Sequence, residues 1–290
     1  MAAADVEATD DEPAEDAADE EQTPGTEAEP VDSLTVVIRA EVLQQVVDQL
    51  LTIVDEAIFR IGYDGLAVSA VDPANVAMVD IEVDPGAFES VGDGMFPIGL
   101  NLQRLDDYID GASGSDPITL SFDAETLSLH IEHTNVEVDM AGINTDMMRG
   151  EPDIPEVDHR AEFEVDAKVF RDAVENAELV SDHVRFEADV DDGELAVSGE
   201  GDTDEIRTVI GADELLGANF TEGVTSLFSL PYLVGGSQGG SKYGGILKPL
   251  SSGTELSGRL DQEMPIFLDY EFEGGFGNVR MMLAPRIQND

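Results

Sequence analysis

The four histidines are the first candidates for metal binding or acid–base chemistry: His130, His133, His159 and His183. His130 and His133 are close in sequence, but they stand three residues apart in a segment that alternates like a β-strand. Successive side chains of a strand point to opposite faces, so this spacing separates the two imidazoles. It argues against a metal site at this pair.

The glycine-rich segment at 235–242 contains two patterns associated with catalysis or phosphate binding. Gly-Gly-Ser-Gln-Gly at 235–239 matches a nucleophile pattern that needs a strand before it and a helix after it. Here a short helix precedes it and more glycine follows. Gly240, Ser241 and Lys242 resemble the end of a phosphate-binding loop, but the lysine comes one place late and no Ser or Thr follows it. We therefore predict a flexible loop.

A third candidate, Glu-Ala-Asp-Val-Asp-Asp-Gly at 187–193, is similar to a calcium-binding loop whose glycine is displaced by one position. Asp192-Gly193 is a favoured β-hairpin turn, which explains the segment better. With these patterns set aside, the sequence predicts no catalytic site, no cofactor and no metal. We expect a binding protein and not an enzyme.

Charge is the strongest compositional signal. The chain has 64 acidic and 14 basic residues among 290, a formal net charge of -50, and only three lysines. Such self-repulsion destabilises a compact fold in dilute buffer. At molar salt the screening length falls to about 3 Å and the repulsion largely disappears. The composition therefore indicates a protein of a halophile with a salty cytoplasm.

The composition also bears on the alternative of a disordered acidic protein. That alternative fits residues 1–33, which hold 13 acidic residues and no basic one, without helical or strand periodicity. It does not fit the rest, because the apolar content of 42% is strongly periodic. No apolar run is long enough to span a membrane, and the N-terminus lacks a signal-peptide pattern. We expect a soluble, cytoplasmic protein without disulfides, since cysteine is absent.

The pattern becomes regular from residue 34. A β-rich run at 34–39 feeds an amphipathic helix with an apolar stripe of Leu43, Val46, Val47, Leu50, Leu51 and Val54. A second helix is predicted at 101–109. Strands are predicted at 57–61, 65–70, 76–83, 118–122, 126–131 and 136–141.

The second half repeats this order. A helix is predicted at 168–179 and another from residue 230, with strands at 163–165, 184–188, 195–198, 206–210, 255–260, 266–272 and 278–283. Leu-Ala-Val-Ser occurs at 66–69 and again at 195–198. We predict two similar β-α-β-β-β-α-β-β domains, 34–143 and 161–290, after a disordered tail at 1–33. The proline-containing, acidic segment 144–160 reads as an extended connector.

Four dispersed segments resemble the DNA sliding clamps of the proliferating cell nuclear antigen family, in particular the haloarchaeal type. They are Val-Asp-Pro-Ala-Asn-Val-Ala-Met at 71–78, Glu-Pro-Asp-Ile-Pro at 151–155, Leu-Val-Ser-Asp-His-Val at 179–184 and Met-Leu-Ala-Pro-Arg-Ile at 282–287. The resemblance covers about 34–290.

The resemblance implies an α+β fold of two clamp domains, with helices on one face of curved antiparallel sheets. Three copies would form a pseudo-sixfold ring, a homotrimeric processivity factor around duplex DNA. The edge strand at 135–141 would pair with the edge at 204–210 of the next copy. The ring would tether a DNA polymerase, flap nuclease and ligase, and interact with a clamp loader, during DNA replication and repair.

Partners of such clamps insert a short motif with apolar and aromatic anchors. In this sequence the resemblance places the partner-binding pocket at Val71, Val76, Met78, Ile154, Pro155, Pro265, Met282, Leu283 and Pro285.

The sequence departs from the family where basic side chains face DNA. Gln44, Gln45, Asp107, Asp110 and Glu175 stand where relatives carry bases, and the DNA-facing candidates that remain are Arg104, Lys168, Arg171 and Lys242. Pro231 and the glycine run after it also predict a truncated last helix followed by a mobile loop. Either salt makes phosphate attraction unimportant, or the chain is a divergent second clamp. A clamp-fold scaffold with little DNA contact is the main rival.

Overall fold

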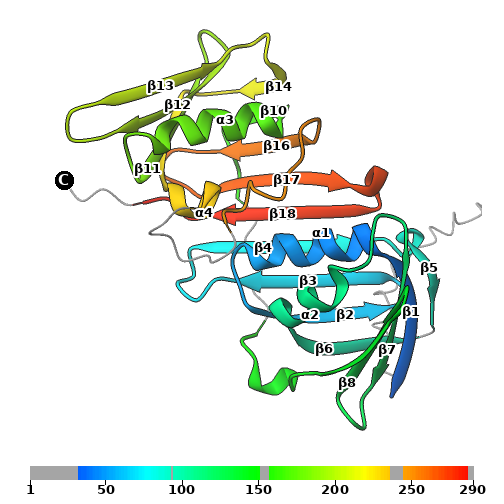
Figure 1. Ribbon diagram of the computed structural model, residues 1–290. Helices are drawn as coiled ribbons and strands as arrows, with labels where there is room; N and C mark the ends of the chain where they lie inside the picture. The colour runs from blue at the N-terminus through cyan, green and yellow to red at the C-terminus, as the bar shows by residue number, and fades with distance from the viewer. Residues whose placement is uncertain (1–31, 93, 151–156, 236–243, 287–290) are drawn as a thin grey trace, which may run out of the picture.

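The computed structural model describes residues 32–92, 94–150, 157–235 and 244–286 (Figure 1). Two helices and nine strands make up the first half. They are β1 (Ser33–Arg39), α1 (Ala40–Leu51), β2 (Glu56–Gly62), β3 (Gly65–Val71), β4 (Ala77–Val83), β5 (Phe88–Val91), β6 (Met95–Asn101), α2 (Leu102–Ile109), β7 (Pro117–Asp123), β8 (Ser128–His133) and β9 (Val136–Ala141).

The second half has the same kinds of element in the same order. They are β10 (Ala161–Asp166), α3 (Ala167–Glu178), β11 (His183–Asp189), β12 (Glu194–Glu200), β13 (Glu205–Ile210), β14 (Leu215–Phe220), β15 (Val224–Ser229), α4 (Leu230–Val234), β16 (Glu255–Leu260), β17 (Ile266–Phe272) and β18 (Gly277–Leu283). Short 3-10 turns lie at Pro85–Ala87, Thr145–Met147 and Glu273–Gly275.

Apolar periodicity explains the helices. In α1 the stripe Leu43, Val46, Val47 and Leu50 is at most 1% exposed, as the spacing predicts. The last helix, α4, is five residues long, with Pro231 near its start, so the predicted truncation is confirmed. The predicted mobile loop after it falls largely outside the described residues.

The strands form three antiparallel sheets. Their orders are β5-β1-β7-β8-β9, β13-β12-β11-β15 and the nine-stranded β14-β10-β16-β17-β18-β4-β3-β2-β6. The long sheet crosses from one half of the chain to the other, because β18 pairs with β4 along seven residues. All four helices lie on the same side of this continuous sheet (Figure 1). The core lies between the helices and the sheets.

The predicted element order was incomplete. Each half has two further strands between its fourth predicted strand and its second helix: β5 and β6 in the first half, β14 and β15 in the second. Gly94, Pro97 and Gly99 interrupt the alternation in and beside β6, and β14 (Leu-Leu-Gly-Ala-Asn-Phe) has no alternation. Sequence periodicity therefore missed these strands.

The repeat itself is present in the structure. Leu66 pairs with Val83 in the first half, and Leu195, its counterpart in the repeated tetrapeptide, pairs with Ile210 in the second. Among the described residues, no helix is long and apolar enough to cross a membrane.

Candidate partner-binding site and helix-side surface

An apolar row crosses four strands at the place where the two halves of the chain meet. The strand register puts Val71 opposite Met78, Met78 opposite Met282, and Met282 opposite Phe267. Directly opposed residues of a sheet share a face. This row therefore lies on one face, spanning β3, β4, β18 and β17.

The face that carries the row is the one turned away from the helices. Met281 and Leu283 flank Met282 on β18, point to the opposite face and have no exposed surface. Gln49 of α1 contacts Met281, with 3.1 Å between Nε2 and Sδ. Met282 therefore belongs to the outer face. Leu283 is a core residue on the helix side and lines no outer pocket.

The turn between β3 and β4 is held by one buried carboxylate. Asp72 is 4% exposed, and its side chain accepts hydrogen bonds from the backbone N–H groups of Ala74, Val76 and Ala77, at 2.6–3.0 Å. Asn75 takes a positive φ of 58°, a conformation that asparagine tolerates better than most residues. The turn fixes the position of Val76 at the end of the sheet.

Two prolines lie at the same end. The backbone N–H of Ala284 donates to the carbonyl of Val76 across 2.8 Å, which brings the following residue, Pro285, beside the turn. Pro265 precedes Ile266, whose pairing partner is Leu283. The structure thus brings together Val71, Val76, Met78, Pro265, Met282 and Pro285 from three distant segments. Ile154 and Pro155 lie outside the described residues.

The first part of the predicted connector is attached to this turn by an arginine. Arg149 donates from Nη1 to the carbonyl of Asp72 across 2.8 Å and from Nη2 to Oδ1 of Asn75 across 2.7 Å. Met148, beside it, lines a cavity of about 350 Å³ together with Val71 and Pro73. The connector therefore begins against the outer face, next to the apolar row.

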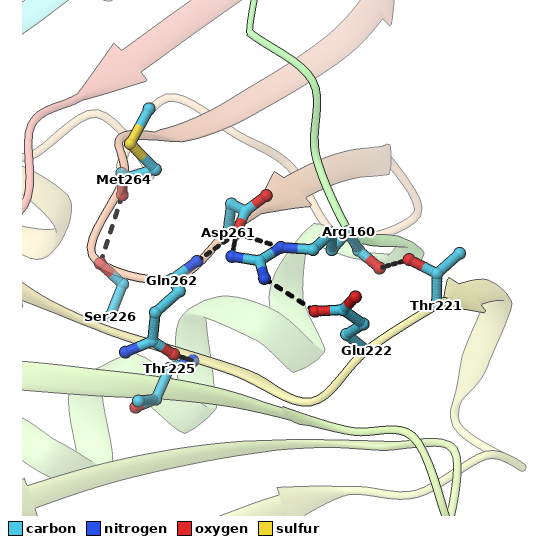
Figure 2. A network of polar contacts seen from close by, with 8 residues as sticks. All are labelled: Arg160, Thr221, Glu222, Thr225, Ser226, Asp261, Gln262 and Met264. Atoms are coloured by element: carbon cyan, nitrogen blue, oxygen red, sulfur yellow. Dashed lines mark hydrogen bonds and ion pairs between the residues drawn. The ribbon is translucent and has the colours of Figure 1, made fainter.

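A second arginine fixes the far end of the connector (Figure 2). Arg160 donates from Nε to Oδ1 of Asp261 across 2.7 Å and from Nη1 to Oε2 of Glu222 across 2.7 Å. Its carbonyl accepts the Thr221 hydroxyl across 2.9 Å. These contacts hold the pKa of Asp261 below its ordinary value, chiefly through the hydrogen bond from Arg160.

His159, the neighbour of Arg160, packs on the apolar row. The His159 and Phe267 rings meet edge-on, with 5.0 Å between their centres. The guanidinium of Arg259 lies 5.1 Å from the centre of the Phe267 ring. Burial, and then the nearby Arg259 charge, lower the pKa of His159. The uncharged imidazole is therefore the form that suits this contact. Both described ends of the connector lie on the outer face.

Known proteins share both the sequence and this architecture. Residues 35–153 match the model of the N-terminal domain of proliferating cell nuclear antigen. DNA polymerase sliding clamps of Natronomonas pharaonis and Haloarcula marismortui are each 36% identical over 255 residues, covering 88% of this chain and 98% of theirs. The chain belongs to the DNA sliding clamp family.

Solved structures agree with this membership. The structure described as the C-terminal region of FEN-1 bound to A. fulgidus PCNA has a TM-score of 0.79 and 31% identity, covering 89% of this chain and all of the other. PCNA from Thermococcus kodakaraensis has a TM-score of 0.75 at 23% identity, a likeness of fold. The predicted α+β clamp fold and the predicted haloarchaeal type are confirmed. Sliding clamps are processivity factors without catalysis, so the expectation of a non-enzyme is confirmed as well.

The basic residues expected to face DNA in this clamp lie on its helices. Arg104 on α2 is exposed and donates to the Tyr108 hydroxyl across 3.1 Å. Lys168 on α3 is half-exposed and forms an ion pair with Asp172. Arg171 donates to the Leu250 carbonyl across 2.7 Å, so it supports the segment that follows α4. Lys242 lies outside the described residues.

Acidic residues dominate the same side of the clamp. Burial, followed by the charges of Asp106 and Asp110, raises the pKa of Asp48 on α1. Burial and the neighbouring Asp110 and Asp107 carboxylates raise the pKa of Asp106. These shifts show that α1 and α2 bring carboxylates close enough to repel one another. The helix side is a poor electrostatic match for phosphates.

Sequence reasoning missed the two arginines that anchor the connector. The chain has 14 basic residues in all, and two of them, Arg149 and Arg160, stand within the predicted connector at 144–160. In so acidic a chain, that placement was the available signal. The predicted separation of two histidines is confirmed: His130 is half-exposed, whereas His133 is buried and contacts the Tyr108 carbonyl at 2.8 Å.

Proposed function

We propose that this protein is a DNA polymerase sliding clamp that encircles duplex DNA as a ring of three copies and tethers replication and repair enzymes. One observation is the main support for assembly into a ring. Strand β9 lies at the edge of its sheet and β13 at the edge of another, each paired on one side only among the described residues. Open edges of this length are aggregation-prone unless a partner covers them.

A head-to-tail contact between β9 and the β13 of the next copy satisfies both edges at once. Such heterologous contacts generate a closed ring when the rotation between copies closes. The two proposed clamp domains, 34–143 and 161–290, joined by the connector at 144–160, then give six similar units around three copies. The acidic segment 1–33 is proposed as a separate tail, and the proposed location is the cytoplasm.

The apolar row is the proposed site for partners. Val76, Met78 and the two prolines are partly exposed, and the buried Val71 and Met282 continue the same row. Such an apolar surface suits binding in which a few anchor residues supply most of the energy. A short motif with apolar and aromatic anchors fits this surface, with Ile154 and Pro155 of the connector as its other wall. A FEN-1 segment is bound to the A. fulgidus relative. Flap nuclease, polymerase, ligase and clamp loader are therefore the proposed partners.

A second candidate function rests on the acidic helix side. A clamp-fold scaffold, or a divergent second clamp with a regulatory role, would assemble the same partners without gripping DNA. The carboxylate cluster of Asp48, Asp106 and Asp110 favours this candidate. The loss of attraction matters less at molar salt, where phosphate contacts are weakened for every protein. The encircling clamp therefore stays the first proposal.

Two measurements test the proposal. Light scattering in molar KCl should give three times the monomer mass, whereas a monomer would contradict the ring. A peptide with an apolar and aromatic clamp-binding motif should bind the wild-type protein and bind Ile154→Asp much more weakly. Equal binding by the variant would remove the pocket assignment while leaving the ring intact.

A further inference from the structure

The internal repeat allows the register of the contact between copies to be derived from one chain. By strand order, β5-β1-β7-β8-β9 of the first half corresponds to β14-β10-β16-β17-β18 of the second. Likewise β6-β2-β3-β4 corresponds to β15-β11-β12-β13. Strands β18 and β4 pair within the chain, so their counterparts β9 and β13 are left as the same kind of edges. The β18–β4 pairing, the seam inside the chain, is therefore a template for the β9–β13 pairing, the seam between copies.

The strand pairings fix which residues correspond. On one edge, Val83 and Ile210 both face the first leucine of the repeated Leu-Ala-Val-Ser, which makes Asp80 equivalent to Arg207. On the other edge, the residues before α1 and α3 are Arg39 and Asp166. Following the pairings from these two residues across each sheet makes Arg280 equivalent to Glu137.

Arg280 faces Asp80 in the seam inside the chain. We propose that the β9 edge of one copy pairs with the β13 edge of the next in the register that sets Glu137 opposite Arg207, so that the two seams of the ring carry opposite charge polarity and each edge accepts only its correct partner. This inference rests on the proposed ring and adds its register and its selectivity.

The apolar side chains of the two edges fit this register. In the seam inside the chain, Val79 and Met281 face each other, and neither is exposed. Their counterparts are Ile206 on β13 and Val138 on β9, and both keep exposed surface in the single chain. Val136, next along the inner face of β9, is 39% exposed. Joining the edges buries this surface in the same way.

Repulsion between like charges disfavours the wrong strand pairings. In the seam between copies, the facing residues are the negative Glu137 on β9 and the positive Arg207 on β13. In the seam inside the chain the signs are reversed, with the positive Arg280 on β18 and the negative Asp80 on β4. Pairing β9 with the β4 of another copy sets Glu137 against Asp80, and pairing β18 with β13 sets Arg280 against Arg207. Like charges directly opposite each other destabilise a sheet. Exchange between the two kinds of seam is therefore disfavoured, and so are β9–β9 contacts, because both charged residues of β9, Glu137 and Asp139, are acidic.

Residues beside Glu137 and Arg207 add to the attraction between the two edges in one row of opposed residues and reduce it in the next row. Arg185 lies in the same row as Arg207, across Ser198, and Glu132 lies beside Glu137. Arg207 faces Glu137 directly, with Arg185 and Glu132 further back in the same row. Arg207 also has Glu187 of its own chain as an ion-pair partner, with 3.7 Å between Nη2 and Oε1. In the adjacent row Asp139 meets Glu205. Asp139 also has His130 as a partner at 2.8 Å. This like-charged row makes screening by salt necessary for assembly.

Charge reversal tests the pair in the full-length protein. Glu137→Arg and Arg207→Glu should each raise the dissociation constant of the trimer by about tenfold or more, since each contact of the ring loses an attraction and gains a repulsion. The double variant restores opposite charges and should recover the wild-type constant. Failure of the double variant to recover would overturn the pairing of these two residues. Circular dichroism of each variant confirms that the chain is folded.

The double variant also tests the selectivity. It gives both seams the same polarity, so exchange between them is no longer opposed. Refolded from denaturant, it should yield more high-mass species than the wild type at the same concentration. An equal yield would overturn the selectivity while leaving the register in place.

Disulfide cross-linking tests the register independently, because the chain has no cysteine of its own. Asp139→Cys with Glu205→Cys should oxidise to covalent dimers and trimers, whereas Ala141→Cys with Glu205→Cys, two residues out of register, should cross-link far less. Preferential linking of the second pair, with a trimer by light scattering, would overturn the register and keep the ring. A monomer with no cross-links would contradict the proposed function itself.

Discussion

The Tyr232 hydroxyl donates a hydrogen bond to Oδ2 of Asp72 across 2.9 Å, linking residues 160 positions apart in the chain. Tyr232 belongs to α4 on the helix side, and Asp72 holds the turn that carries Val76 of the apolar row. Burial, and then the Asp72 carboxylate, raise the pKa of Tyr232 to about 12. A hydroxyl on the helix side therefore supports the outer-face site.

Tyr232→Phe removes this hydroxyl alone and leaves Asp72 with one donor fewer. We expect the free energy of unfolding to fall by about 1.5–3 kcal/mol, the usual range for a hydrogen bond to a charged acceptor. Chemical denaturation in molar KCl measures it. Tyr108→Phe, at a hydroxyl on the exposed face of α2, is the matched control and should change stability by less than about 0.5 kcal/mol. Equal effects of both variants would argue against a supporting role for the contact.

Met281 and Met282 are neighbours on β18 that face opposite sides of the sheet. Met281→Ala should destabilise the fold by about 2–5 kcal/mol, because it leaves a cavity in the core. Met282→Ala should weaken binding of the partner-motif peptide about tenfold or more, at a smaller cost in stability. Calorimetric titration and denaturation of both variants separate the two effects. The reverse pattern would place the binding surface on the helix side.

The ion pair of Arg160 with Asp261 predicts an acid dependence of stability. The unfolded carboxyl has a higher pKa than the folded one, so the folded state binds this proton more weakly. The contact therefore adds stability above the ordinary value of about 3.9 and loses it as the pH falls through the folded pKa. Asp261→Asn should lower the Tm at pH 7 and have a smaller effect near pH 2.

The exposed Asp191 provides the control for that experiment, because Asp191→Asn changes the charge by the same amount on a hairpin turn. Its Tm should stay close to that of the wild type at neutral pH. A loss of Tm in Asp261→Asn that is the same at pH 7 and pH 2 would show that the charged form of Asp261 contributes nothing.

Salt should control both the fold and the ring. The acidic side chains behind the net charge of -50 repel one another. The screening length of this repulsion is about 10 Å at 0.1 M salt but only about 3 Å at 1 M. We expect the Tm and the trimer fraction to fall together as KCl is lowered. Sucrose at low salt screens no charge and should not restore the trimer. A trimer that persists unchanged in dilute buffer would contradict the inferred salt requirement.

The sequence predicted those parts of the fold that depend on local pattern. The apolar residues of α1 recur at spacings of three and four and so face the core together. The repeated Leu-Ala-Val-Ser marks equivalent strands because both copies sit at the same place in a hairpin. Strand β5 has four residues and β14 no alternation, so neither leaves a local signal. Their pairing is decided by β1 and β10, which lie far away in the sequence.

The candidate site, like the fold, was predictable only in part. Val71, Met78 and Met282 were identified by resemblance, but the sequence could not show that Leu283, next to Met282, faces the core. That depends on the register of β18 against β17 and β4. Arg149 and Arg160 were missed because their partners, Asn75 and Asp261, are brought close only by the tertiary fold.

Retention on DNA shows whether the protein encircles the duplex. The protein is loaded onto a nicked circular duplex in molar KCl, separated from free protein by gel filtration, and measured again after a single cut linearises the DNA. An encircling clamp should stay with the circle and be lost from the linear form, because topology and not phosphate attraction holds it. Absence from both forms, with the trimer intact, would contradict the encircling clamp and leave the scaffold.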